Sequence, residues 1–305
     1  MSRKCSKFYT RITKLFLIMI GFFSHNTYAN SYNTETAKIF ASIYSDGKAT
    51  SSQLDNIYLN QKSEGLNIFK GRIRNAKHLA DTVSENHRLY EKAISLCLPV
   101  ANQISQEVET TVDKVSSYLN MSNDVSVDII FGANNTGGTA SPKGIAIALE
   151  VICQQVETTE EAKLVILSYV AHEVVHVYQY RQNKRSDFNF TLLELSLIEG
   201  VADLVASEIL GDNYMLDIER EKYGTQNEML LWQEFKPYMH GMNYAPWMYS
   251  KPIGERPIDM GYWVGKSIAK AYSEQYSKKQ IAFHKLLVLE DSKAILKYSR
   301  YNPRN

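Results

Sequence analysis

The feature that most constrains this chain is a long apolar segment, residues 159–182, with two histidines and a glutamate in its middle. Thr158 followed by Glu161 forms a capping box, so we predict a helix from about Thr159 to Gln182. Apolar residues cover most of the circumference of this helix, which is typical of a buried central helix. A large core must therefore form around it.

The centre of this predicted helix has the sequence His172-Glu173-Val174-Val175-His176. Histidines four positions apart lie on one helix face, so both imidazoles can bind a single tetrahedral ion. Glu173 would stand beside the ion and take a proton from water, whose pKa zinc lowers toward about 7. The alternative is a polar surface patch, but these residues would be costly to bury here without a partner. We predict one zinc ion per chain, held by His172 and His176, with Glu173 as the catalytic base.

A catalytic zinc site needs a third protein ligand and one open position. A second predicted helix, about residues 191–210, contains the sequence EGVAD at residues 199–203. We predict Glu199 as the third ligand and Asp203 as the acceptor for the outer N–H of a zinc histidine. The small residues beside Glu199 are expected to let this helix approach the first. At about 100° per residue, Glu194 and Glu208 point away from Glu199 on this helix. The alternative interpretation of residues 199–203 is an amphipathic helix with exposed acidic side chains.

The other segments predict an α+β fold that is mainly α. Residues 125–131 alternate in polarity and are rich in β-branched side chains, so they predict a strand. A Gly-rich turn at residues 132–144 leads to a second predicted strand, residues 145–152. Further predicted helices occupy most of residues 34–120, the segment up to Phe235, residues 259–276 and two short stretches at the end, with an aromatic, Pro-rich loop at residues 236–257.

The N-terminus predicts an export signal. Five basic residues precede the nine-residue apolar stretch Leu15–Phe23, and small residues end the segment at Ala29. This order is typical of a secretory signal peptide over residues 1–29, and nine apolar residues are too few for the alternative, a membrane anchor. We expect a secreted or periplasmic protein with no stable membrane anchor after cleavage. Residues 30–305 are then one domain, with a helical part at 30–124 and a zinc-binding catalytic part at 125–305.

Charge and cysteine content narrow the function further. The net charge is +1, and the signal carries five positive charges, so the mature protein is about −4 (+1 minus +5). A mildly acidic chain without a basic run does not support nucleic-acid binding. Cys97 and Cys153 remain after cleavage of the signal. In an oxidising compartment they can pair, and two buried thiols are the equal alternative.

HEVVH followed by EGVAD resembles the gluzincins, the thermolysin-like metallopeptidases with a HExxH helix and a later ExxxD helix. More specifically, the chain is similar to bacterial predicted zinc-dependent proteases related to the gliding-motility lipoprotein B group. The matching stretches are NNTGGTASPKGIAIALE, HEVVHVYQ, LIEGVADLVA and GYWVGKSIAKAY. The resemblance implies a zincin-like helical core with a small sheet, and zinc at His172, His176 and Glu199. Unlike the lipoprotein members, this chain has no lipid-accepting cysteine after its apolar stretch.

Two further sites follow from the resemblance. Gluzincins bind an extended peptide along an edge strand that precedes the HExxH helix. Residues 137–141 are the candidate here, because glycines permit close backbone approach, although an ordinary hairpin loop is equally consistent. An electrophile is also expected at the reacting carbonyl. Tyr262, His240 and Tyr249 compete for this role, and Tyr262 is the first choice because it lies in the matching stretch GYWVG, with a packed core tyrosine as the alternative.

The function predicted from these observations is hydrolysis of peptide or protein substrates by a zinc metallopeptidase. The main rival is a non-catalytic component of an envelope or secretion assembly in which zinc is structural. An intact Glu173 argues against that rival, since a purely structural site does not use the glutamate. A zinc hydrolase with non-peptide substrates is a third possibility, and the sequence does not define the substrate.

Overall fold

The computed structural model describes residues 31–154, 156–183, 189–250 and 253–304 of the chain. The predicted signal peptide therefore lies outside the described residues. The fold is mainly helical with a small four-stranded sheet, which confirms the predicted α+β class. The strands are β1 (Tyr32–Asn33), β2 (Ser126–Ile130), β3 (Gly138–Ala140) and β4 (Gly144–Ala148). The helices and helical turns are α1 (Glu35–Ile43), α2 (Ser51–Gln53), η1 (Leu54–Tyr58), α3 (Glu64–Ile73), α4 (Ala76–Glu85), α5 (His87–Lys92), η2 (Ala93–Cys97), α6 (Leu98–Ala101), α7 (Ser105–Leu119), α8 (Leu149–Ile152), α9 (Thr159–Gln182), α10 (Leu192–Leu210), η3 (Gly211–Asn213), α11 (Ile218–Phe235), α12 (Met260–Ser273), α13 (Lys279–Val288) and α14 (Ser292–Ser299).

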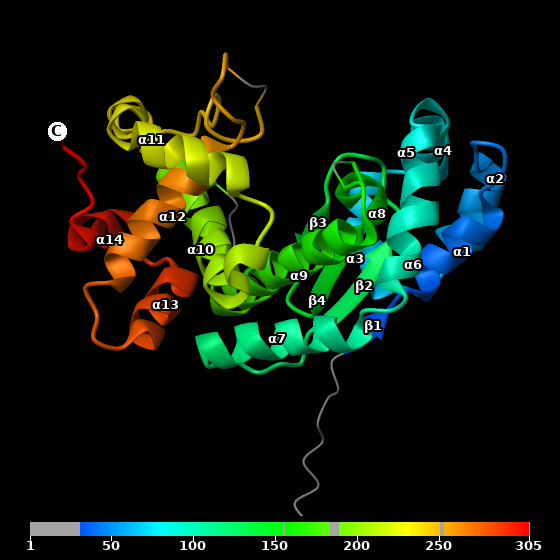
Figure 1. Cartoon of the computed structure of the whole chain (residues 1–305), viewed down its shortest axis with the longest axis horizontal. Coiled ribbons are helices and arrows are strands. Elements are labelled where there is room, and N and C mark those ends of the chain that lie inside the picture. The colour runs from blue at the N-terminus through cyan, green and yellow to red at the C-terminus, as the bar shows by residue number, and fades with distance from the viewer. Residues whose placement is uncertain (1–30, 155, 184–188, 251–252, 305) are drawn as a thin grey trace, which may run out of the picture.

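Helix α9 is the central element of the molecule (Figure 1). The sheet and the N-terminal helices lie on one side of it, and α10 to α14 lie on the other side. Its bounds agree with the prediction, because Thr158 and Glu161 form the expected capping box. α9 packs against β3, β4, α7 and α10, so most of its surface is buried, as its apolar circumference requires. Among the described residues, no helix combines the length and apolar character needed to cross a bilayer.

The sheet has the order β1-β2-β4-β3, with β1, β2 and β4 parallel and β3 antiparallel to β4. The strand predicted at residues 125–131 is confirmed as β2. The strand predicted at 145–152 is wrong beyond Ala148, where the chain turns into α8. In that short helix the buried carboxylate of Glu150 accepts hydrogen bonds from the backbone N–H groups of Gly132 and Asn134. This tertiary contact anchors the Gly-rich turn and outweighs the local strand preference.

Within the segment 137–141, residues Gly138–Ala140 form strand β3, which lies at one edge of the sheet and also forms a hairpin with β4. Ala148 N donates to Gly137 O, and Ser141 N donates to Gly144 O. In an antiparallel pair, alternate residues face the partner strand. The backbone polar groups of Gly138 and Ala140 therefore point away from β4.

Helix α10 packs most tightly on α12 through two glycines. A Cβ atom on Gly200 would lie 2.1 Å from the backbone nitrogen of Lys266, and one on Gly265 would lie 1.7 Å from Ser196 O. Only glycine permits two backbones to come this close. The expectation that small residues beside Glu199 serve the approach to α9 is therefore wrong for Gly200, because its close contact is with α12.

Cys97 and Cys153 form a disulfide with a Cα–Cα distance of 6.2 Å. Cys97 ends η2, and Cys153 follows α8. The bond thus joins the N-terminal helices to the segment between the sheet and α9. The sequence alone had left open whether these two cysteines pair.

The α10–α12 contact generates a stability prediction. We expect Gly200→Ala to lower the free energy of unfolding by about 3 kcal/mol, or to prevent folding, because the added methyl group meets backbone atoms that cannot move independently. Gly71→Ala is the matched control, since it lies in α3 with no atom within 4 Å of the added Cβ, and alanine there should be neutral or stabilising by up to about 1 kcal/mol. Urea denaturation followed by circular dichroism measures both. Equal stability of the two variants would contradict the assigned contact.

Candidate metal centre

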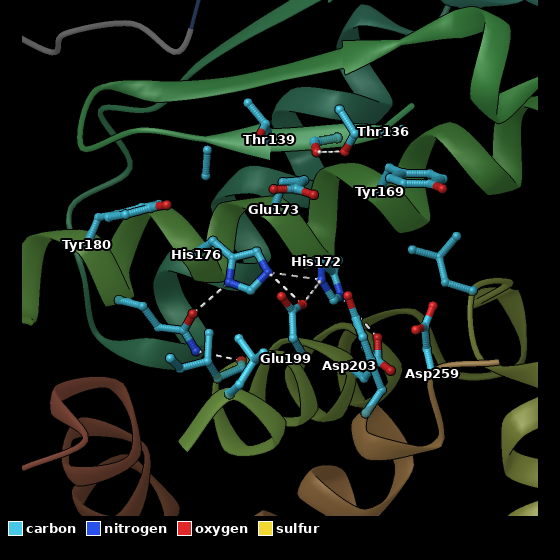
Figure 2. Close-up of a pocket in the computed structure, with 18 of the residues that line it drawn as sticks. Thr136, Thr139, Tyr169, His172, Glu173, His176, Tyr180, Glu199, Asp203 and Asp259 are labelled. Carbon is cyan, nitrogen blue, oxygen red and sulfur yellow. Dashed lines mark hydrogen bonds and ion pairs between the residues drawn. The ribbon is translucent and has the colours of Figure 1, made fainter. Parts of the chain in front are cut away.

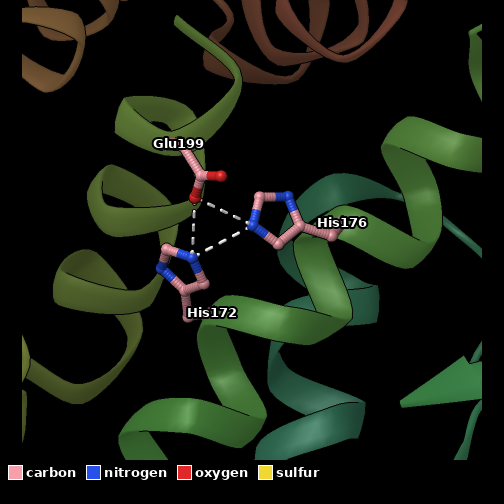
Figure 3. Close-up of side chains that lie close together, drawn as sticks. All are labelled: His172, His176 and Glu199. Carbon is pink, nitrogen blue, oxygen red and sulfur yellow. Dashed lines mark hydrogen bonds and ion pairs between the residues drawn. The ribbon is translucent and has the colours of Figure 1, made fainter. Parts of the chain in front are cut away.

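Three side chains from two helices converge near the centre of the molecule (Figure 3). His172 and His176 come from α9, and Glu199 comes from α10. The Nε2 atoms of the two histidines are 3.0 Å apart, and Glu199 Oε2 lies 3.3 Å from His172 Nε2 and 3.2 Å from His176 Nε2. One ligand atom from each residue lies within 4.8 Å of the others, so the group could hold a metal ion.

The outer nitrogen of each histidine is held by an acceptor. His172 Nδ1 lies 3.0 Å from Asp203 Oδ1, and His176 Nδ1 lies 2.6 Å from Gln179 Oε1. Because both partners are oxygen acceptors, each Nδ1 donates a hydrogen bond to its partner, and Nε2 is the nitrogen that each ring directs to the centre, where a metal ion would replace any proton that it carries. Two imidazole lone pairs and a carboxylate oxygen are the donor set of a catalytic zinc site.

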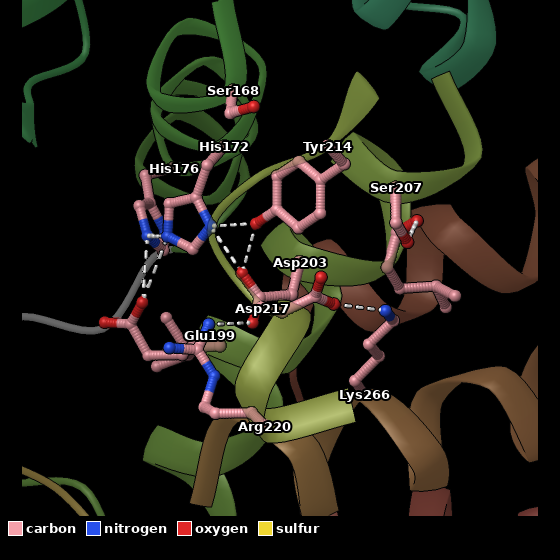
Figure 4. A network of polar contacts seen from close by, with 12 residues as sticks. Ser168, His172, His176, Glu199, Asp203, Ser207, Tyr214, Asp217, Arg220 and Lys266 are labelled. Atoms are coloured by element: carbon pink, nitrogen blue, oxygen red, sulfur yellow. Dashed lines mark hydrogen bonds and ion pairs between the residues drawn. The ribbon is translucent and has the colours of Figure 1, made fainter. Parts of the chain in front are cut away.

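Asp203 is in turn held by residues beyond α9 and α10 (Figure 4). Tyr214 OH donates to Asp203 Oδ1, and Arg220 Nη2 donates to Asp203 Oδ2 at 2.9 Å. The Asp203 side chain is only 1% exposed, so these bonds balance its charge in the absence of water. Of the two histidines, His172 is the one that Asp203 contacts, and Tyr214 and Arg220 fix the Asp203 carboxylate.

The electrostatics favour positive charge where the three side chains meet. Burial lowers the pKa of His172, but bonds to Asp203 and Glu199 outweigh burial and raise that pKa to about 10. Burial raises the pKa of Glu199, but the two histidines hold it well below its usual range. Burial likewise opposes ionisation of Asp203, and Arg220 and His172 hold its pKa well below the usual range. Both buried carboxylates are therefore charged, which suits a cation held by His172, His176 and Glu199.

The centre opens into a cavity of about 600 Å³ (Figure 2). Glu173 lines this cavity between the histidines and strand β3. A Cβ on Gly138 would lie 2.5 Å from Glu173 Oε1, and one on Gly137 would lie 2.5 Å from the hydroxyl of Tyr169. The paired glycines thus allow the edge strand to lie directly against Glu173. Burial raises the pKa of Glu173, and the two histidines oppose that effect.

Two of the three candidate electrophiles line the cavity. The Tyr262 ring stacks on His172 with centroids 6.3 Å apart, and the Arg220 guanidinium lies 4.9 Å from its centroid on the ring face. Tyr249 OH donates to Glu199 Oε1 at 3.2 Å. His240 is not among the residues that line the cavity. Tyr262 and Tyr249 therefore remain candidates on geometry.

The two other glutamates of α10 have separate roles, in agreement with the helical angle between them and Glu199. Glu194 completes the N-terminal capping box of α10 with Thr191. Glu208 forms an ion pair with Lys279 at 2.9 Å and accepts a hydrogen bond from Tyr118. Neither joins the histidine pair.

Sequence reasoning missed Gln179, Tyr214 and Arg220. Gln179 lies three residues after His176 on the same helix, so helical spacing alone would have placed it beside that ring. Its amide nitrogen also donates to Ile198 O in α10 at 2.8 Å, which joins the two helices. Tyr214 and Arg220 come from later segments, and no local pattern relates them to Asp203.

The geometry generates a prediction about zinc affinity. Glu199→Ala should weaken zinc binding severely, and Asp203→Ala should weaken it by about 10–100-fold, the usual loss when the support of a ligand is removed. Glu194→Ala and Glu208→Ala are the controls on the same helix and should bind zinc normally. Competition titration with a chromogenic chelator measures all four. A zinc-deficient Glu194→Ala or Glu208→Ala variant beside a normal Glu199→Ala variant would contradict the site.

Comparison with known protein families agrees with a zinc site at the cluster of His172, His176 and Glu199. Residues 104–295, well over half of the 305-residue chain, match a family described as "Predicted Zn-dependent protease (DUF2268)". Neither a curated protein nor a solved structure matches the chain. The matched region contains α9, α10 and all three side chains of the cluster. This chain therefore belongs to the family of predicted zinc-dependent proteases.

Proposed function

We propose that this protein is an exported zinc-dependent peptidase of the gluzincin type that hydrolyses peptide bonds. The observation that carries the proposal is the cluster of His172, His176 and Glu199, with Glu173 beside it in a cavity bounded by a free strand edge. The family description supports zinc dependence and protease activity. The gluzincin type rests on the spacing of the two helical motifs.

His172, His176 and Glu199 would hold one zinc ion, since their donor set and their buried negative charge suit it. When bound, zinc supplies a Lewis acid that polarises a carbonyl group and makes water more acidic. Asp203 and Gln179 keep the two imidazoles in the tautomer that offers Nε2 to the centre.

Glu173 is the proposed proton carrier. Its carboxylate lies beside the ligand cluster without belonging to it, and burial raises its pKa. In the proposed reaction it accepts a proton from the attacking water and delivers it to the leaving amine nitrogen. The hydroxyl of Tyr262 is the proposed donor to the developing oxyanion. Tyr249, which is bonded to Glu199, then orients the carboxylate.

The free edge of β3 is the proposed binding surface for an extended peptide. Among the described strands β3 pairs only with β4, so the N–H of Gly138 and both polar groups of Ala140 remain directed outward. Thr136 donates its hydroxyl to Gly138 O at 2.9 Å, which occupies the remaining acceptor. A peptide added here as a fifth strand would place its backbone next to Glu173.

The central test is Glu173→Gln. We expect the variant to keep about one zinc per chain and to lose turnover by at least about 10²–10⁴-fold, the usual contribution of a general base. Glu160→Gln, the same change at a largely exposed position of α9, is the control and should leave turnover unchanged. Zinc content by atomic absorption and casein or peptide cleavage give the two readouts. A fully active Glu173→Gln variant, or one without zinc, would refute the assigned role, and a zinc-loaded wild type that cleaves no peptide would favour a non-catalytic protein.

Export is a separate part of the proposal. The basic N-terminal region followed by an apolar stretch motivates it, and the Cys97–Cys153 disulfide is consistent with an oxidising compartment. We expect N-terminal sequencing of the mature protein to begin near Asn30. A cytosolic species that begins at Met1 would refute export without affecting the metal centre.

A further inference from the structure

Arg72 brings a positive charge from the N-terminal helices to the cavity. It lies near the end of α3, outside residues 104–295, and it lines the same cavity as Glu173 and strand β3. α3 packs against β3 and β4. The side chain of Asn135 donates to Arg72 O at 2.9 Å, which ties this helix end to the turn that leads into β3. Arg72 is therefore held beside the strand edge proposed to bind the peptide.

Arg72 adds a positive charge to the lining of the cavity. Within the part of the chain that the structure describes, Arg72 forms no ion pair. The other arginine that lines the cavity, Arg220, is paired with Asp203 at 2.9 Å. Burial raises the pKa of Glu173 and of Tyr180, and the positive charge of Arg72 lowers the pKa of both groups. An arginine that faces a cleft in this way is available to bind an anion.

Position along the cavity defines where such an anion would bind. In Figure 2, Tyr180 and Asp259 lie at opposite ends of the site, with the histidines between them. Arg72 is tied through Asn135 to the turn that leads into β3 and lines the cavity there, whereas Asp259 accepts a hydrogen bond from Tyr249 N at 2.6 Å. Arg72 thus adds its positive charge beside strand β3, whereas the charge of Arg220 is paired with Asp203.

We propose that Arg72 determines specificity by binding a substrate carboxylate, so that the substrates are peptides with an acidic group on one side of the scissile bond. This inference rests on the proposed peptidase function. A guanidinium binds a carboxylate through two parallel hydrogen bonds, which distinguish it from a neutral amide of the same shape. The carboxylate comes from an aspartate or glutamate side chain, or from the C-terminus of the substrate.

The experiment uses quenched fluorogenic peptides built around a bond that the zinc-loaded mature protein cleaves. Glutamate replaces glutamine one position at a time in peptides with an amidated C-terminus, and a second set compares a free with an amidated C-terminus. We expect one arrangement to raise kcat/KM about tenfold or more, the effect of one charge-assisted hydrogen bond. A gain in the first set identifies a side-chain carboxylate, and a gain in the second set identifies a terminal one.

Variants then assign the preference to Arg72. In Arg72→Gln, the ratio of kcat/KM for the acidic peptide to kcat/KM for the neutral peptide should fall to about one, while the neutral peptide is still cleaved. In Arg72→Glu, a peptide with lysine at the same position should be favoured. Lys70→Gln removes an exposed positive charge from the same helix outside the cavity, so it should retain the full preference. A wild type that cleaves acidic and neutral peptides equally, or an Arg72→Gln variant that keeps the preference, would overturn the inference.

Failure of the proposed function has a different signature. If the zinc-loaded protein cleaves no peptide, the affinities of the same labelled peptides are measured by fluorescence anisotropy. Preferential binding of the acidic member, lost in Arg72→Gln but kept in Lys70→Gln, would support Arg72 without peptidase activity. Equal binding of the acidic and neutral peptides would reject it.

Discussion

The structure depends on the meeting of two buried helices at a point where three electron-pair donors face one another. The Nε2 atoms of His172 and His176 are 3.0 Å apart, and the carboxylate of Glu199 lies within 3.3 Å of both. Such a largely buried group is unfavourable unless a positive charge lies among its members. The distance between α9 and α10 is therefore coupled to the charge at the centre, so that binding of a cation there also stabilises the fold.

The geometry of this point is maintained from outside the two helices. Arg220 of α11 holds Asp203, and Tyr262 of α12 packs between Arg220 and His172. Gly200 and Gly265 set the separation of α10 from α12 at backbone contact, so Glu199 has little freedom to move. Precise placement of ligand side chains requires this kind of support, because a small displacement changes the coordination geometry.

The opposite wall of the cavity comes from the sheet and from the N-terminal helices. Glu150 holds the turn at Gly132 and Asn134, and this turn delivers Gly137 and Gly138 to the face of Tyr169 and Glu173. Arg72 reaches the same wall from a part of the chain that the family match does not include. The metal centre and most of this wall thus lie within residues 104–295, and Arg72 adds a charge to the wall from outside that region.

Local patterns were sufficient wherever the physical cause is local. The capping boxes at Thr158 and Thr191 define where α9 and α10 begin, and helical periodicity alone puts His172 with His176 and Glu199 with Asp203 on common faces. Gln179 was accessible by the same periodicity but was overlooked. Contacts between distant segments were not accessible from local patterns, and only the need for a third zinc ligand and the family resemblance related Glu199 and Asp203 to the histidines. The end of β4 at Ala148, the α12 partner of Gly200, the disulfide, and the roles of Tyr214, Arg220 and Arg72 all arise from packing, because a side chain's partner across the core depends on the arrangement of whole elements and not on its neighbours in the chain.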